Sequence, residues 1–237
     1  MTKDEPTDVV RTLACLSSMA TRGLLSELTG EGGGRTPAEV TLTAIGGVDA
    51  ARRVRSHEVT DVVVLAKDVM LALADEGLIL PNSLAPVAIC GIAVAVRRDS
   101  SCPDIGTEAA VRQALLDAAR IAYSTGPSGN HLMSLLQGWG ILPQLETRLT
   151  QARPGVPVAK LLADGEADLG FQQFSELIGQ PGIIVLGPLP QTIQALTTFT
   201  AGIARTSRQP EAARLLIEAL TRSDTADIKR RYGMEPG

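Results

Sequence analysis

The sequence predicts an α/β fold with two lobes, each a sheet flanked by helices, and a ligand cleft between them. Short apolar segments alternate with helical patterns along the 237 residues, which is typical of this fold class. The run 61–66 (DVVVLA) is continuously apolar, as expected for a parallel strand buried on both faces. A long apolar run at 88–96 predicts a strand that crosses from one lobe to the other.

Three strand–helix units make up the first third of the chain. Small or polar residues end each strand, and Ser18 is suited to cap the first helix. The glycine-rich segment 30–34 (GEGGG) is expected to be a flexible loop. The predicted strands are 9–16, 40–45 and 61–66, and the predicted helices are 19–28, 49–55 and 69–76.

The second lobe follows the crossing strand, and the chain then returns to the first lobe. The predicted strands after residue 96 are 121–123, 169–172, 183–186 and 198–204, and the predicted helices are 107–119, 130–137, 158–163, 210–221 and 224–232. This order predicts a discontinuous first lobe, 1–86 plus 198–237, and a second lobe, 87–197. The hinge is expected near residues 84–90 and 195–200.

Composition excludes several classes of function. Aromatic residues make up only 3% of the chain, so stacking platforms for bases or sugars are not expected. The net charge is −4 and no sustained basic run is present, which argues against nucleic acid as a partner. No apolar run approaches the length of about 18 residues that a membrane-spanning helix needs, so membrane insertion is not expected.

Metal and cofactor sites are not expected either. The three cysteines, Cys15, Cys90 and Cys102, are widely spaced and form no C-x-x-C pair. His57 and His131 are too few for a histidine-rich metal site. The first nine residues, MTKDEPTDV, lack the pattern of a secretory signal. The chain as written is therefore expected in the cytoplasm, or in the periplasm if a signal peptide has been removed.

The predicted strands end in small residues that leave backbone N–H groups accessible. Ser17-Ser18, Gly46-Gly47 and the segment 124–129 (STGPSG) each stand between a strand and a helix. Helix N-termini carry about half a positive charge each and attract anions. In open α/β sheets, ligands bind beyond the carboxyl ends of the strands. The sequence therefore predicts a cleft for a small anion.

Five segments together resemble a known family almost end to end. They are LACLSSMATRGL, DVVVLAKDVMLALADEGLI, IAYSTGPSGNHLMSLL, LADGEADLGFQQFSELI and PEAARLLIEALTRSDTADIKRRYGMEP. The sequence resembles bacterial solute-binding proteins, specifically the molybdate-binding branch of the type II periplasmic binding fold. The resemblance implies two lobes that close on a ligand and, if the protein is exported, an ABC permease as partner.

The resemblance also implies a set of ligand-binding positions. The family's second serine cluster falls at Gly46-Gly47, its tyrosine at Gln173, and one of its small residues at Lys67. These departures favour an organic carboxylate over molybdate, because a carboxylate takes a charged partner and additional hydrogen bonds. The candidate ligand-binding residues are Ser17, Ser18, Gly46, Gly47, Lys67, Ser124, Gly126, Ser128, Gly129, Val156, Gln172 and Gln173.

Three functions agree with these candidates. The first is a binding protein for a small anion, and the second is an isomerase of an unsaturated polycarboxylate, as relatives with this fold isomerise aconitate. The third is a cytoplasmic ligand sensor that acts through a partner. An isomerase needs a positioned acid or base and an anion clamp, for which Lys67, His131 and Glu176 are candidates beside the serines.

Several candidates also have a purely structural interpretation. Ser18 can serve only as a helix cap, and Lys67 can be an ordinary solvated lysine. His131 can cap a helix or lie in solvent. Gln172 and Gln173 can satisfy hydrogen bonds at the end of a strand.

Overall fold

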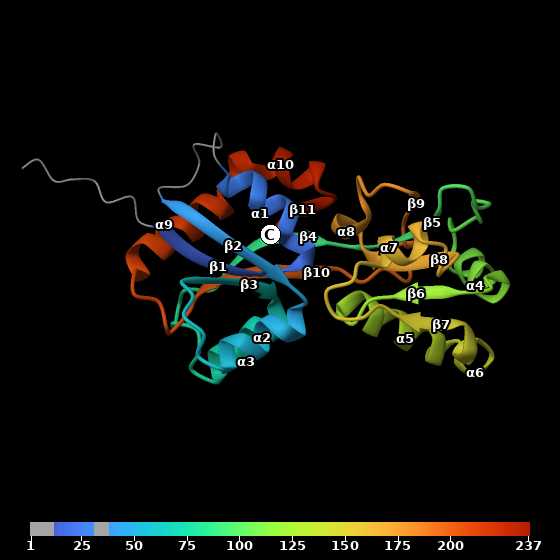
Figure 1. Ribbon diagram of the computed structural model, residues 1–237, viewed down its shortest axis with the longest axis horizontal. Helices are drawn as coiled ribbons and strands as arrows, with labels where there is room; N and C mark the ends of the chain where they lie inside the picture. The colour runs from blue at the N-terminus through green and yellow to red at the C-terminus, as the bar shows by residue number, and fades with distance from the viewer. Residues whose placement is uncertain (1–11, 31–37) are drawn as a thin grey trace, which may run out of the picture.

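The computed structural model describes residues 12–30 and 38–237 as two mixed sheets flanked by helices (Figure 1). The predicted two-lobe α/β fold is confirmed. The predicted strand residues 9–11, and 31–34 of the glycine-rich segment, lie outside the described residues.

The first sheet has six strands in the order β11-β4-β10-β3-β1-β2. Strand β1 is parallel to β2 and β3, so the carboxyl ends of these three strands meet at one edge of the sheet. Strand β10 is antiparallel to β3 and β4. The strands are β1 (Thr12–Ser18), β2 (Glu39–Ile45), β3 (Val62–Ala66), β4 (Ala85–Cys90), β10 (Thr197–Ile203) and β11 (Met234–Pro236).

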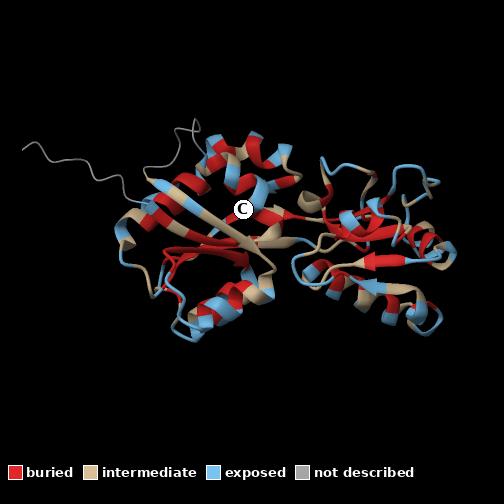
Figure 2. Ribbon diagram, in the orientation of Figure 1, coloured by how far each residue is buried: buried red, intermediate tan, exposed pale blue. Residues whose placement is uncertain are grey.

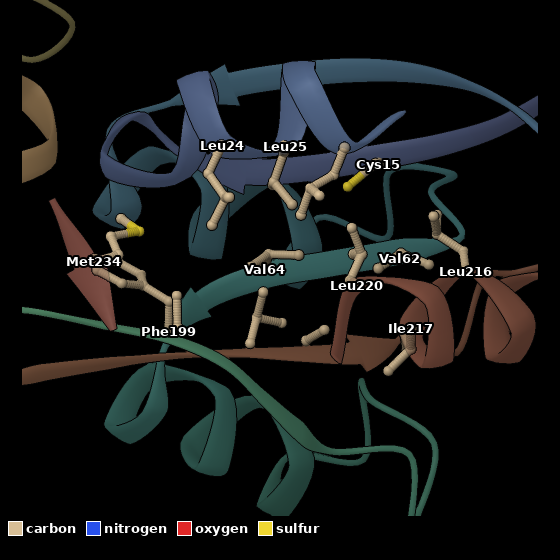
Figure 3. Packing of buried hydrophobic residues seen from close by; sticks show 14 of the residues in the cluster. Cys15, Leu24, Leu25, Val62, Val64, Phe199, Leu216, Ile217, Leu220 and Met234 are labelled. Atoms are coloured by element: carbon tan, nitrogen blue, oxygen red, sulfur yellow. The ribbon is translucent and has the colours of Figure 1, made fainter. Parts of the chain in front are cut away.

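Helices cover both faces of the first sheet. Buried residues of α1 and α9 pack with Val62 and Val64 on one face (Figure 3), and Ile228 of α10 belongs to the same cluster. Buried residues of α2 and α3 pack with Val63 and Leu65 on the other face. Strand β3 is thus buried on both faces, as its sequence predicts. The helices are η1 (Met19–Thr21), α1 (Arg22–Thr29), α2 (Gly47–Arg55), α3 (Lys67–Asp75), α9 (Pro210–Thr221), η3 (Ser223–Thr225) and α10 (Ala226–Arg231).

The second sheet has five strands in the order β7-β6-β8-β5-β9 and its own buried layers (Figure 2). Strand β6 is parallel to β7 and β8. The strands are β5 (Ile92–Arg97), β6 (Ile121–Tyr123), β7 (Leu149–Gln151), β8 (Leu169–Gln173) and β9 (Ile183–Pro188). The helices are α4 (Glu108–Asp117), α5 (Pro127–Gly138), α6 (Leu142–Leu145), η2 (Glu146–Arg148), α7 (Val158–Ala163) and α8 (Phe174–Leu177).

The crossing segment was predicted as one strand, 88–96, but the structure contains two strands there. It divides at Gly91 into β4, which pairs in the first sheet, and β5, which pairs in the second. Gly91 packs closely against the side chain of Gln194, and a Cβ added to Gly91 would lie only 3.1 Å from that side chain. The predicted lobe boundaries, 86/87 and 197/198, fall within β4 and β10. The division of the chain there, and the hinge, stay predictions.

Helix α5 also differs from its prediction, since it begins at Pro127 rather than at residue 130. Proline is well suited to the first position of a helix, where its missing N–H would have no intrahelical acceptor. Short elements that the sequence did not indicate include α6, α8, β7 and β11. Among the described residues, no helix is both long enough and apolar enough to span a membrane.

Candidate functional site

A pocket of about 160 Å³ lies between the two sheets. The carboxyl ends of β1, β2 and β3 form one wall, and the ends of β6, β7 and β8 form the other. Of the predicted ligand-binding residues, those in the pocket wall are Ser18, Gly46, Gly47, Ser124, Gly126, Ser128, Val156, Gln172 and Gln173.

Three helices of eight residues or more begin at this pocket. The residues before α2, α3 and α5 are Gly46, Ala66 and Gly126, and no side chain among the described residues caps these helices. The first intrahelical bond of α2 is that from Ala50 N to Gly46 O, at 2.9 Å. The N–H groups in the first turns of α2 and α3 therefore lack a helical acceptor. In α5, Pro127 has no N–H and Gly129 N donates to Gly126 O at 3.1 Å, which leaves the N–H of Ser128. The helix dipoles add positive potential at the pocket.

The two serines at the end of β1 have different environments. Ser18 lines the pocket, and its Oγ accepts a hydrogen bond from Ala20 N at 3.3 Å, which confirms it as an N-cap. Its hydroxyl proton is still available to a ligand. Ser17 is fully buried outside the pocket wall, and its Oγ donates to Ser18 O at 3.3 Å. Side chains alternate along a strand, so Ser17 does not share the orientation of Ser18.

The loop before α5 is held by its own polar groups. The hydroxyl oxygens of Ser124 and Ser128 lie 2.8 Å apart, and Gly126 N donates to Ser124 Oγ at 3.2 Å. All three residues line the pocket. Gly129 does not line the pocket, because its Cα packs against the backbone of Ser124. A Cβ added to Gly129 would lie 1.8 Å from Ser124 O. Gly129 therefore allows a close approach of two backbone segments, and the ligand contact that the sequence suggested for it stays a prediction.

Replacing Gly129 with Ala is expected to destabilise the protein by about 1–3 kcal/mol, because the loop backbone would have to move away from the new methyl group. Gly138, at the other end of α5, is a matched control, since a Cβ there meets nothing within 4 Å. Gly138→Ala should leave stability unchanged or raise it. Urea unfolding measures both variants, and equal stabilities would contradict the role assigned to Gly129.

Gln172 connects α7 to Glu176 within the second wall. Its Oε1 accepts from Val158 N at 2.9 Å, and its Nε2 donates to Glu176 Oε1 at 2.8 Å. Because both ends of the amide have protein partners, Gln172 positions Glu176 rather than being free for a ligand. This is the structural interpretation that the sequence left open.

Glu176 is the half-buried carboxyl group of the pocket. Burial raises the pKa of Glu176 to about 7, and the hydrogen bond from Gln172 opposes part of that rise. Only Oε1 has a hydrogen-bond partner among the described residues. Since no fully buried side-chain oxygen in the described part of the chain lacks a partner, Oε2 is accessible to solvent. Glu176 can therefore accept or donate a proton near neutral pH.

Gln173 lies where the two crossing strands meet. Its amide nitrogen is placed to donate to Cys90 O and Gly91 O, at 3.3 Å each, while its oxygen accepts from the Thr197 hydroxyl at 2.9 Å. The side chain is buried, although the residue borders the pocket. Gln173 thus satisfies hydrogen bonds at a strand end, so the position does not supply a free ligand donor in this conformation.

Two residues that the sequence suggested for catalysis do not line the pocket. Lys67 is solvent-exposed at the first position of α3, although its neighbours Ala66 and Asp68 line the wall. His131 is half-buried, and its Nε2 lies 2.8 Å from Ile193 O. A carbonyl only accepts, so Nε2 carries the proton in this contact. The structure thus places neither side chain in the pocket wall, and their proposed catalytic roles stay predictions.

Other pocket residues were missed by the sequence reasoning. Arg153 lies two residues after the end of β7, a three-residue strand without a periodic pattern. Asp68 lines the pocket next to Lys67, which the sequence suggested in its place. Thr125 and Asn130 complete the polar part of the loop wall. The signal that could have found Arg153 is a basic residue in the turn Ala-Arg-Pro-Gly before a helix. No group of three metal-ligating side chains occurs within residues 12–30 and 38–237.

Comparisons with known proteins agree with this architecture. The Azotobacter vinelandii periplasmic molybdate-binding protein has a similar structure, with a TM-score of 0.78 and 20% identity over 94% of this chain and 98% of that one. The substrate-binding protein of an ABC transporter from Agrobacterium tumefaciens has a TM-score of 0.70 and 14% identity, over 95% and 79% of the two chains.

Sequence comparison identifies closer relatives. An aconitate isomerase from Pseudomonas sp is 32% identical, over 96% of this chain and 88% of that protein. The model of the bacterial extracellular solute-binding protein family matches residues 13–235, which includes both sheets and every wall of the pocket. The chain therefore belongs to the family of bacterial extracellular solute-binding proteins.

Proposed function

We propose that the chain binds a small polycarboxylate in the pocket between its sheets and isomerises it, with aconitate as the substrate. The observation that carries this proposal is Glu176, a pocket carboxyl with one free oxygen and a pKa of about 7. The 32% identity to an aconitate isomerase supports the choice of substrate.

The wall supplies the means to hold an anion. Three helices start at the pocket without side-chain caps, and the Ser18 hydroxyl lies beside them. Backbone N–H groups at helix N-termini bind carboxylates as readily as oxyanions. Such groups, on α2 and α3 in one wall and at Ser128 in the other, suit a ligand with more than one carboxylate.

Glu176 suits the proton shift that isomerises aconitate. Its ionised Oε2 takes a proton from the methylene group next to the double bond, and the electron pair of the broken C–H bond enters the allylic system. The same carboxyl then returns a proton to the far carbon, so that one C–H bond forms and the double bond moves. No oxidant, reductant or further reactant is needed. Gln172 holds Oε1 during both steps.

The same carboxyl disfavours molybdate as the ligand. A tetrahedral dianion needs a ring of neutral donors, whereas Glu176 places an ionisable acid in the wall. Its protonated form can donate a hydrogen bond to an oxyanion, but this form predominates only below a pH of about 7, so a site that only binds an oxyanion would lose the donor above that pH. An isomerase uses the ionised and the protonated carboxyl in turn, whereas a site that only binds an oxyanion does not.

The test is to incubate the protein with cis-aconitate in D2O and to follow both isomers by proton NMR. Conversion to trans-aconitate with deuterium uptake at the allylic carbons is the expected result. Thermal-shift measurements with molybdate, tungstate, sulfate and citrate establish the ligand class in parallel. Stabilisation by molybdate or tungstate alone, with no isomerisation, would overturn the proposal.

A second candidate is binding without turnover, followed by delivery to an ABC permease across the periplasm. Membership of an extracellular solute-binding family favours it. A protein that binds tricarboxylates tightly but exchanges no deuterium would support this function over the isomerase.

A further inference from the structure

We propose that Arg153 binds one carboxylate of the substrate and determines the preference for polycarboxylates. This inference deepens the proposed function and rests on it. Arg153 is the one lysine or arginine among the described residues that line the pocket. No lysine or arginine belongs to the first wall, so Arg153 alone supplies a full positive charge to a ligand there.

The Arg153 guanidinium has no partner among the residues that the structure describes. The residue is exposed, and its side chain forms no ion pair or hydrogen bond within the described part of the chain. Two other arginines of this lobe are engaged, Arg120 with Asp168 at 2.9 Å and Arg148 with Leu116 O at 2.8 Å. An unpaired guanidinium at a pocket can receive a carboxylate without first breaking an existing contact.

The backbone on both sides of Arg153 is held in place. Ala152 is buried and its N–H donates to Tyr123 O at 2.8 Å, which ties the residue to β6. Val156 N donates to Arg153 O at 2.9 Å and closes the turn, while Gly155 takes a φ of +79° that suits glycine. The base of the side chain is therefore positioned, and only the side chain itself has to be ordered by a ligand.

The acidic side chains of the pocket wall call for a basic residue if the pocket is to bind a ligand with several negative charges. Asp68 and Glu176 are the acidic side chains of the wall, and each disfavours a bound anion when it is ionised. Neutral N–H groups offset this only in part for a ligand with several negative charges. Arg153 supplies an opposite charge, and its planar guanidinium matches a carboxylate with two parallel hydrogen bonds.

The test measures the binding of tricarballylate, a saturated tricarboxylate that cannot be isomerised, by isothermal titration calorimetry. Arg153→Gln is expected to weaken binding about 10-fold or more, because it removes charge-assisted hydrogen bonds to a substrate carboxylate. Arg153→Lys should lose part of that affinity, because an ammonium cannot form the paired hydrogen bonds. Arg112→Gln is the matched control, an exposed arginine of α4 outside the pocket wall.

Isomerisation kinetics add a second readout. A residue that holds the substrate equally in its ground and transition states raises KM and leaves kcat unchanged when it is removed. Equal tricarballylate affinity for Arg153→Gln and the wild type would overturn the role of Arg153 while leaving the proposed function intact. Absence of tricarballylate binding by the wild type would overturn both.

Discussion

Replacing Glu176 with glutamine is expected to lower kcat for aconitate isomerisation by about 10²–10⁴-fold, the usual contribution of a positioned acid or base. Glutamine keeps the size of the side chain and an oxygen that can accept from Gln172 Nε2, which donates to Oε1 at 2.8 Å in the native protein. It cannot take a proton from the substrate. Deuterium uptake from D2O, followed by NMR, measures the loss directly.

The effect should be confined to the chemical step. Affinity for tricarballylate is expected to be kept or improved, because the amide removes a negative charge from the wall. Glu146→Gln, at an exposed position outside the pocket wall, is the matched control and should isomerise as the wild type does. Wild-type deuterium uptake by Glu176→Gln would show that another group moves the proton.

The pH dependence of the reaction follows from the same carboxyl. Glu176 must be ionised to take the first proton, and burial raises its pKa to about 7. We therefore expect kcat/KM for isomerisation, measured by NMR across this range, to rise from pH 5 to about 7 and then to level off.

The second large effect is on stability. Glu176 has an ordinary pKa of 4.5 in the unfolded chain and about 7 in the folded protein. Between these values the folded state holds a proton that the unfolded state has lost, so raising the pH favours unfolding. The contribution of this carboxyl to the free energy of unfolding is fully present below pH 4.5, declines between pH 4.5 and about 7, and is lost at higher pH. A shift of this size corresponds to about 3 kcal/mol at most.

Urea unfolding of the wild type and of Glu176→Gln at pH 5 and pH 8 measures this linkage. All other titrating groups are shared, so the difference between the two proteins isolates Glu176. The variant should gain stability relative to the wild type as the pH rises. Glu146→Gln should follow the wild type at both pH values, since that side chain is exposed. If all three proteins change in parallel, the environment assigned to Glu176 is wrong.

Local patterns predicted most of the helices and strands. The continuous apolar run of β3 indicated burial on both faces, and the amphipathic segment 210–221 corresponds to α9 (Pro210–Thr221). The crossing strand was mispredicted because the apolar run 88–96 has the same character on both sides of Gly91. Cys90 pairs with Thr197 and Ile92 with Gln173, and partners so distant along the chain leave no local signal.

The pocket was predictable only in part. Small residues at strand ends indicated Gly46, Gly126 and the serines, because parallel strands bring their carboxyl ends to one edge. Which polar side chains remain free for a ligand depends on contacts between distant segments. Gln173 is occupied by the crossing strands and His131 by Ile193 O, and neither contact has a signature in the sequence.

The sequence by itself determined the α/β class, the burial of the central strand and a cleft lined by small residues, because periodicity and turn chemistry are local properties. Tertiary structure alone decided that Glu176 borders the pocket beside Gln172, that Arg153 lines it without a partner among the described residues, and that Lys67 does not line it. The physical reason is that pairing, desolvation and exposure depend on which strands become neighbours, and that is settled only when both sheets are assembled.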